Sequence, residues 1–190
     1  TIVIIPARMG SSRFPGKPMA MINGKPMIEH VYKNVGKSKI INDVFVATCD
    51  KEIYDFIISI GGKAIMTSKL HNRCTSRCAE ALKKIEKKYR KKFDIVVMVQ
   101  GDEPMINNKM ISQSVRPLLK NKKKNIINLL GEIKTIDEFK SPNSIKVTYD
   151  KNLKVLYFSR KPIPSGTDSD LSKIGKQVCV ISFRRNYLLL

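Results

Sequence analysis

The sequence predicts an α/β fold: a mostly parallel, Rossmann-like sheet flanked by helices, with added mixed or antiparallel strands in the second half. Short apolar runs alternate with segments of helical periodicity, which is typical of a parallel sheet. The run FDIVVMVQ at 93–100 is apolar without alternation, as expected for a strand buried on both faces. After residue 125, apolar runs follow one another with turns between them and little helix, which indicates the antiparallel part.

The expected elements follow in chain order. Strands are expected at 1–5, 44–48, 63–66 and 94–99, and later near 126–132, 144–149, 154–158 and 176–182. Helices are expected at 26–36, 51–60, 76–90 and 107–119. Two of these helices show an apolar face at helical spacing, formed by Cys78, Ala79, Leu82, Ile85 and Tyr89 in one and by Met110, Ile111, Val115, Leu118 and Leu119 in the other.

The segment 162–176, PIPSGTDSDLSKIGK, is rich in turn formers and predicts a mobile loop or lid. No internal repeat and no linker divides the chain, so residues 1–190 are expected to form a single domain.

Composition bounds the class of protein. With 42% hydrophobic and 27% charged residues, the 190-residue chain is expected to be globular rather than disordered. No apolar run approaches the length of a bilayer span, and the apolar start lacks a basic leader, so neither a membrane partner nor a signal peptide is expected. Four cysteines without a dense framework suit a reducing compartment, and we predict a cytoplasmic location.

The formal net charge of +20 raises the possibility of nucleic-acid binding. The excess is spread as lysine, in KKIEKKYRKK at 83–92 and KNKKKN at 120–125, without the interleaved aromatics or concentrated arginine of such readers. A solvated basic surface explains these runs, so no nucleic-acid partner is expected. Such a surface would also attract nucleoside triphosphates and acidic sugars.

The first eighteen residues, TIVIIPARMGSSRFPGKP, carry the most information about function. A buried strand leads into a loop of small residues interleaved with Arg8, Arg13 and Lys17. Small residues let backbone N–H groups approach phosphate oxygens, and the cations offset phosphate charge. The pattern therefore predicts a polyphosphate site. Ordinary surface charge is the competing interpretation.

Two common phosphate motifs do not fit this loop. Gly10 and Gly16 are one residue too far apart for a P-loop, and Pro18 stands where the magnesium-binding hydroxyl belongs. The dinucleotide fingerprint with three spaced glycines is also absent.

A second motif, which is acidic, follows the strand expected at 94–99. It consists of Gln100-Gly101-Asp102-Glu103-Pro104. Ligands of open α/β sheets bind at the carboxyl ends of strands, where a carboxylate near a triphosphate is well placed to hold Mg²⁺. Gly101 permits close approach of the backbone. Asp102 or Asn107 could instead cap the helix expected at 107–119.

Taken together, these stretches resemble the sugar nucleotidyltransferases, specifically the cytidylyltransferases that activate 3-deoxy-manno-octulosonate (Kdo), a lipopolysaccharide precursor. The resemblance spans essentially the whole chain. The stretches that carry it are PARMGSSRFPGKP at 6–18, INGKPMIEHV at 22–31, VATCD at 46–50, VQGDEPMI at 99–106, PNSIKV at 142–147 and YFSR at 157–160.

The resemblance implies a nucleotidyltransferase sheet, CTP and an acidic sugar as substrates, and roles for individual residues. It implies Arg8, Lys17 and Asp102 as catalytic residues and Asp102 as the Mg²⁺ ligand, with Glu103 as a further contributor. The nucleotide-binding residues that it implies are Ala7, Arg8, Gly10, Ser11, Arg13, Lys17, Arg77 and Gln100. Arg160 and Gln177 fall at sugar-binding positions.

Some positions depart from the family's pattern. Arg73-Cys74 and Ser76 replace Ser-Gly and an acid in the loop before Arg77, which adds bulk where the base should lie. Gln177 stands where many relatives have His, and Ile181 where they have Tyr. These changes keep a second hypothesis open: a nucleotidyltransferase for another sugar or base. A basic nucleic-acid-binding module is the third.

Family members also continue past the point that corresponds to Leu190, so the chain is expected to lack the family's C-terminal portion. A homodimer is expected if the full-length chain is longer. A zinc site at His71, Cys74, Cys78 and Cys49 is an alternative to buried thiols, which are the simpler interpretation because no Cys-x-x-Cys pair exists.

Overall fold

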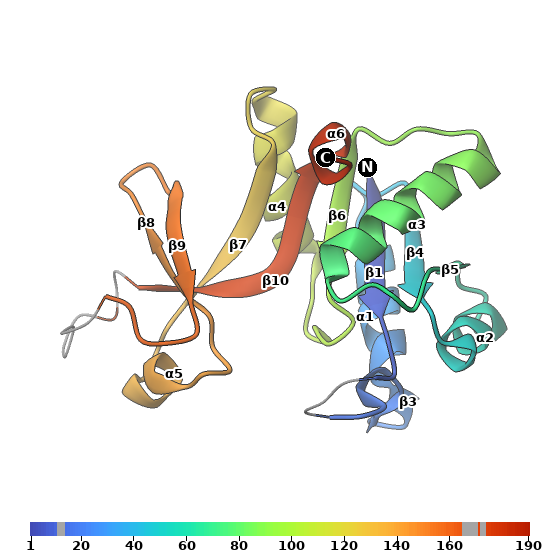
Figure 1. Ribbon diagram of the computed structural model, residues 1–190, viewed down its shortest axis with the longest axis horizontal. Coiled ribbons are helices and arrows are strands. Elements are labelled where there is room, and N and C mark those ends of the chain that lie inside the picture. The colour runs from blue at the N-terminus through green and yellow to red at the C-terminus, as the bar shows by residue number, and fades with distance from the viewer. Residues whose placement is uncertain (11–13, 165–170, 172–173) are drawn as a thin grey trace. The chain divides into compact units, whose positions relative to one another are not determined.

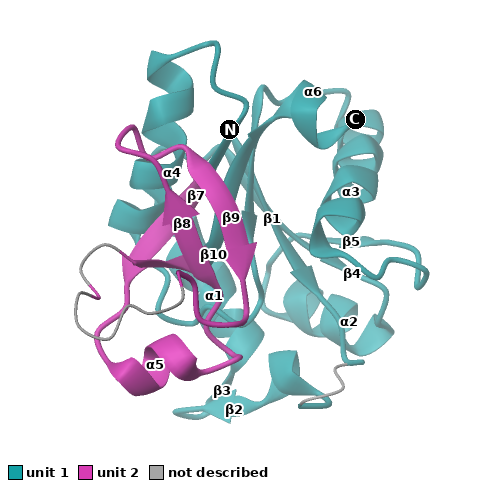
Figure 2. Ribbon diagram, turned by 60° about the vertical axis from the view of Figure 1, so that its left-hand side comes forward, with its two compact units in different colours: residues 1–127, 179–190 teal, residues 128–178 magenta. Residues whose placement is uncertain are grey.

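The computed structural model describes residues 1–10, 14–164, 171 and 174–190. The chain forms two compact units, the first made of residues 1–127 and 179–190 and the second of residues 128–178 (Figure 2). Strands β7 (Ile126–Glu132) and β10 (Gly175–Arg184) carry the chain from one unit into the other. The single-domain expectation stays a prediction.

Unit 1 is built on the predicted parallel sheet. Its strand order is β5-β4-β1-β6-β10, with β1 parallel to both β4 and β6, and β4 parallel to β5. The last part of β10, from Val180 to Arg184, runs antiparallel to β6. Every residue of β1 and β6 is buried, as the continuous apolar runs predicted. The parallel strands are β1 (Ile2–Ala7), β4 (Asp43–Thr48), β5 (Ala64–Met66) and β6 (Ile95–Val99).

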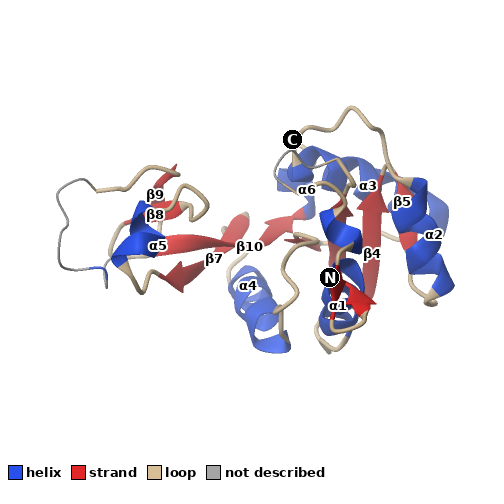
Figure 3. Ribbon diagram, turned by 90° about the horizontal axis from the view of Figure 1, so that it is seen from below, coloured by secondary structure: helices blue, strands red, loops and turns tan. Residues whose placement is uncertain are grey.

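The four predicted helices of unit 1 are all present (Figure 1). Helix α3 covers one face of the sheet, and α1 and α4 cover the other (Figure 3). The bounds are α1 (Met27–Gly36), α2 (Lys51–Ser59), α3 (Cys74–Tyr89) and α4 (Asn108–Lys120). Short elements complete the unit: a 3-10 turn η1 (Lys17–Met19), the hairpin β2 (Met21–Ile22) and β3 (Lys25–Pro26), and α6 (Arg185–Leu188).

The core of unit 1 explains how α3 is held. Cys78, Leu82 and Ile85 pack with Ile2 and Ile4 of β1, as the helical spacing predicted. The prediction was wrong at one position of the same helix and was met only in part at another. Ala81 rather than Ala79 faces the sheet, and Tyr89 is 46% exposed because it lies at the helix end, with its ring edge against Phe45.

Unit 2 is the predicted antiparallel part. Strands β8 (Lys146–Tyr149) and β9 (Val155–Ser159) form an antiparallel pair, and the start of β10 pairs with β8 through Gly175 and Lys176. A short helix, α5 (Ile136–Lys140), was not predicted. Its Phe139 packs with Ile133 and Ile174 in a small core.

The predicted lid at 162–176 falls largely on residues 165–170 and 172–173, which lie outside the described residues. None of the helices in the described part of the chain is both long enough and apolar enough to cross a membrane.

Candidate active site

The candidate site lies at one edge of the sheet in unit 1. Strands β1 and β6 pair in parallel, with Ile4 opposite Met98, so the residues that follow each strand emerge at the same edge. Arg8 follows β1 and Gln100 follows β6. The fold therefore brings the cationic loop after β1 and the acidic loop after β6 together.

Lys17 and Asp102 are in direct contact at this edge. Lys17 Nζ donates a hydrogen bond to Asp102 Oδ2 over 2.7 Å, and 37% and 39% of the two side chains remain exposed. An ion pair this exposed adds little to stability. The pair is informative for another reason: it shows that a cation and a carboxylate from segments 85 residues apart lie at the same accessible place.

A hollow of about 130 Å³ surrounds this pair. Its walls combine the end of β1, the turn at η1, the loop after β6 and the first residue of α3. The lining residues are Pro6, Ala7, Arg8, Lys17, Pro18, Cys74, Gln100, Gly101 and Asp102.

Gly101 fits this hollow because it has no side chain. A Cβ at this position would lie 3.1 Å from Ile28 Cδ1 and 3.4 Å from Pro6 O. A side chain at this position would therefore require the end of the Ile28 side chain to shift by a few tenths of an ångström.

The loop after β6 is held by contacts outside the hollow. Gln100 N–H donates to Cys179 O, and Glu103 Oε1 accepts the N–H of Cys179 at 3.4 Å. Asn34 Nδ2 donates to Pro104 O at 3.0 Å. These bonds join the loop to β10 and to α1, which fixes the backbone on both sides of Asp102.

Asn107, not Asp102, caps the helix that follows. Its Oδ1 accepts the N–H groups of Lys109 at 3.0 Å and Met110 at 3.1 Å. The capping alternative therefore applies to Asn107, and the Asp102 carboxylate faces Lys17 instead.

Cys74 lines the hollow, a position that the sequence analysis did not assign to it. Burial raises the pKa of its thiol and the nearby Asp102 carboxylate raises it further, while Arg8 and Arg77 act in the opposite direction. The thiol is therefore protonated at neutral pH, and it lines the hollow as a small and weakly polar group.

Arg77 is not among the lining residues that the structure describes. Its side chain is almost fully buried in the first turns of α3, and Nη1 donates to Thr67 Oγ1 at 2.5 Å and to Ser68 O at 3.2 Å. Its Nη2 is buried without a hydrogen-bond partner. A buried donor left in this state costs free energy, so a small shift that brings an acceptor to it would be favourable.

The predicted sugar-binding residues belong to unit 2. Arg160 is exposed and Nη1 donates to Pro142 O at 2.8 Å. Gln177 Nε2 donates to Asn128 Oδ1 at 2.8 Å. Lys146, fully buried, donates to three carbonyl oxygens, those of Ser141, Ser144 and Arg160, at 2.6–2.7 Å. Burial and the charge of Arg160 lower the pKa of Lys146.

Of the remaining predicted residues, Gly10 is exposed and does not line the hollow, and Ser11 and Arg13 lie outside the described residues. His71 contacts Ser76 Oγ and Glu80 Oε2. Within the described ranges, no three His, Cys, Asp or Glu side chains are grouped as a metal site.

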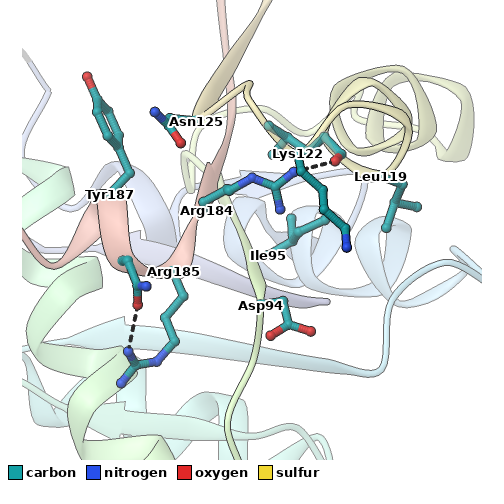
Figure 4. Close-up of a pocket in the computed structure, with 10 residues that line it drawn as sticks. Asp94, Ile95, Leu119, Lys122, Asn125, Arg184, Arg185 and Tyr187 are labelled. Carbon is teal, nitrogen blue, oxygen red and sulfur yellow. Dashed lines mark hydrogen bonds between the residues drawn. The ribbon is translucent and has the colours of Figure 1, made fainter.

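A larger hollow of about 510 Å³ lies at the other end of β6, beside Asp94 and Ile95 (Figure 4). The arginines in its wall already have partners. Arg184 Nη2 donates to Leu118 O at 2.6 Å, and Arg185 forms a two-bond pair with Glu86 at 2.7–2.8 Å. This hollow contains none of the residues that follow β1 and β6 at the opposite edge.

The parallel sheet and the cationic and acidic loops at one edge define a nucleotidyltransferase of the Rossmann-like α/β class. A family model described as "Cytidylyltransferase" matches residues 2–189, and the chain belongs to this family.

Within the family, the chain is similar to proteins named 3-deoxy-manno-octulosonate cytidylyltransferase. The one from Thermodesulfovibrio yellowstonii is 49% identical over 178 residues, which cover 93% of this chain and 69% of that protein. The one from Trichlorobacter lovleyi is 42% identical over 99% of this chain and 77% of its own length.

A solved structure supports the same assignment. It is described as CMP:2-keto-3-deoxy-manno-octonic acid synthetase complexed with CTP, and it matches with a TM-score of 0.86 at 35% identity. The match covers 98% of this chain and 75% of the other. The family resemblance and the fold class predicted from the sequence are confirmed.

Proposed function

We propose that this chain transfers CMP from CTP to the anomeric hydroxyl of 3-deoxy-manno-octulosonate and releases pyrophosphate. The observation that carries the proposal is the contact between Lys17 and Asp102 beside Arg8, at the edge of the sheet where the two family motifs meet. The similarity to a synthetase solved with CTP adds to it.

In this reaction the sugar hydroxyl oxygen bonds to the α-phosphorus of CTP, and the bond from that phosphorus to the bridging oxygen of pyrophosphate breaks. The hydroxyl proton leaves to solvent. Arg8 and Lys17 contact phosphate oxygens and offset the negative charge that develops on them. Lys17 suits this purpose because 37% of its side chain is exposed, and rotation of that side chain would transfer its ammonium from Asp102 to a phosphate.

Asp102 is the proposed ligand of a divalent cation, which cytidylyltransferases commonly use, and we propose Mg²⁺. The donor set fits, since Mg²⁺ is bound by one or two carboxylates together with substrate phosphates and water. The Asp102 carboxylate is partly exposed, and Glu103 is next to it in the chain. When bound, the ion would neutralise charge on the phosphates and fix their geometry.

The remaining roles follow the family resemblance. Ala7, Gly10, Ser11, Arg13 and Gln100 would complete the nucleotide site, and the unpartnered Nη2 of Arg77 would reach an acceptor only after local rearrangement. Arg160 would pair with the sugar carboxylate, because a guanidinium matches a carboxylate with two parallel bonds. Gln177 would contact the sugar after leaving Asn128.

A substrate panel tests the proposal. Pyrophosphate release is measured with each of the four nucleoside triphosphates, with and without Kdo, in the presence and absence of Mg²⁺. Release that needs CTP, Kdo and Mg²⁺ together supports the proposal. Release with another triphosphate or another acidic sugar supports the second hypothesis. That hypothesis is favoured by one observation: Cys74 lines the hollow.

We also propose a homodimer and a cytoplasmic location for the full-length protein. Four free cysteines suit a reducing compartment. Light scattering on the full-length protein measures the assembly, and a monomer at micromolar concentration would contradict the dimer.

A further inference from the structure

The Asp50 carboxylate has an unusual partner. Asp50 precedes α2 at the position where an aspartate normally caps the helix, but its side chain makes no cap hydrogen bond. Instead, Asp50 Oδ2 accepts the backbone N–H of Met9 at 2.8 Å, from a residue 41 positions earlier. The carboxylate therefore acts on the loop after β1 rather than on its own helix.

The register of the sheet explains this contact. Strands β1 and β4 pair in parallel, with Ala7 opposite Thr48, and both end at this pair. Two residues beyond the end of each strand, Met9 and Asp50 lie side by side. Asp50 N–H also donates to Thr48 Oγ1 at 3.1 Å, which fixes the backbone from which the carboxylate projects.

Met9 connects the two ends of the phosphate loop. Its carbonyl oxygen accepts the N–H of Gly16 at 3.0 Å, so the peptide groups of Met9 join the beginning of the loop to its end. Lys17 comes directly after Gly16 and reaches Asp102. One acceptor, Asp50 Oδ2, thus holds the residue to which both ends of the loop are attached.

We propose that Asp50 is a positioning residue for nucleotide binding: through Met9 it holds the phosphate loop so that Arg8 and Lys17 meet the triphosphate. The inference rests on the proposed function for the roles of Arg8 and Lys17. Asp50 lies at the N-terminus of α2, where a negative charge is favourable, and its Oδ2 is bonded to Met9 N–H.

Three variants test the proposal. In Asp50→Ala the acceptor is lost, and we expect the KM for CTP to rise about tenfold, with kcat and the KM for the sugar changed less than about twofold. In Asp50→Asn an oxygen acceptor remains, and we expect the KM for CTP to return to within about threefold of the unsubstituted protein. Glu52→Ala, an exposed acid in the first turn of the same helix, is the matched control and should have no effect.

A merely structural role for Asp50 would give a different pattern. Equal loss in kcat and in both KM values, or a KM for CTP unchanged in Asp50→Ala, would overturn the proposal. Equal impairment in Asp50→Asn and Asp50→Ala would also overturn it, because the negative charge rather than the acceptor would then matter.

Direct binding separates this inference from the proposed function. The dissociation constant for CTP is measured by calorimetry for the unsubstituted protein and both Asp50 variants, without sugar. If the unsubstituted protein binds CTP but has no transferase activity, the proposed function fails, while the ratio of the dissociation constants still tests Asp50. A ratio near one for Asp50→Ala would overturn the inference whatever the activity.

Discussion

Lys17 and Asp102 come from two loops that follow parallel strands, and each keeps more than a third of its side chain exposed. Such a pair contributes at most about 1 kcal/mol to stability. Both side chains are therefore free to exchange their mutual contact for a phosphate or a cation. We therefore expect the two side chains to contribute to ligand binding rather than to stability.

Asp102→Asn should abolish the cation site without unfolding the protein. We expect the rate of pyrophosphate release to fall by about 100-fold or more, because charge stabilisation at the phosphates is lost. Thermal unfolding should stay within a few degrees of the unsubstituted protein. Asp94→Asn is the control, because Asp94 directly precedes β6, at the opposite end of the strand from Asp102, and lines the other hollow. An unchanged rate in Asp102→Asn would remove Asp102 from the mechanism.

Where the structure places the residues predicted from sequence has a physical reason. The closeness of the segments after β1 and β6 was predictable, because segments that follow adjacent parallel strands emerge at the same edge of the sheet. The contact between Lys17 and Asp102 also depends on the return of the chain to Met9 through Gly16, which this rule does not give. Asp50 follows β4, the other neighbour of β1, so the same rule could have found it. Burial of Arg77 was not predictable, because it depends on Thr67 and Ser68, which lie in a loop after a short strand.

Glu80 on α3 makes stability depend on pH. Burial raises its pKa, but hydrogen bonds from Lys84, from the N–H of Ser68 and from His71 outweigh burial and lower the pKa from 4.5 to about 2. The folded-state pKa lies below the unfolded value. The carboxylate therefore stabilises the fold fully above pH 4.5 and loses this effect as the pH falls toward 2.

A comparison of Glu80→Gln with the unsubstituted protein isolates this contribution. The difference in the free energy of unfolding should be largest at pH 6 and shrink by about 1 to 2 kcal/mol at pH 3. Urea titrations at the two pH values measure it, with the exposed Glu52→Gln as control. A difference that does not change with pH would contradict the assignment.

At the scale of elements, long periodic segments were predicted well and short ones were missed. Two missed elements carried local signals. Asn23-Gly24 joins β2 to β3 with positive φ at both residues, as a tight hairpin turn requires. Thr135 and Glu138 form a reciprocal cap at α5: Thr135 Oγ1 accepts Glu138 N–H, and Glu138 Oε2 accepts Lys134 N–H. Apolar periodicity cannot detect elements of two to five residues, but turn and cap chemistry can.

The cap of α4 supports the active-site loop indirectly, because α4 follows that loop in the chain. Asn107→Ala removes an acceptor for two backbone N–H groups and should lower the free energy of unfolding by about 1 kcal/mol. Asn108→Ala, one residue further inside the helix, is the matched control and should have a much smaller effect. Urea unfolding measures both, and equal destabilisation would show that the cap contributes nothing specific.

At the scale of the whole molecule, the formal net charge of +20 is the dominant property. Charge of one sign repels itself in the compact state and draws anionic substrates toward the protein. Both effects are long-range and are screened as salt rises, since the Debye length falls from about 30 Å at 0.01 M to about 8 Å at 0.15 M. The same excess charge therefore favours substrate capture and disfavours the fold at low salt.

The last prediction follows from these two opposite effects of the charge, on substrate capture and on stability. Raising NaCl from 10 to 200 mM should raise the urea midpoint of unfolding and, at the same time, raise the KM for CTP. Replacing the exposed lysines 122, 123 and 124 by glutamine should increase stability at low salt by about 0.5 kcal/mol and reduce its salt dependence. These lysines follow the C-terminal end of α4, whereas the active-site loop precedes its N-terminal end. The substitutions are therefore far from the nucleotide, and kcat should not change. A midpoint that is independent of salt, or an equal salt response in both proteins, would show that self-repulsion does not limit stability, and the charge would then matter for substrate attraction alone.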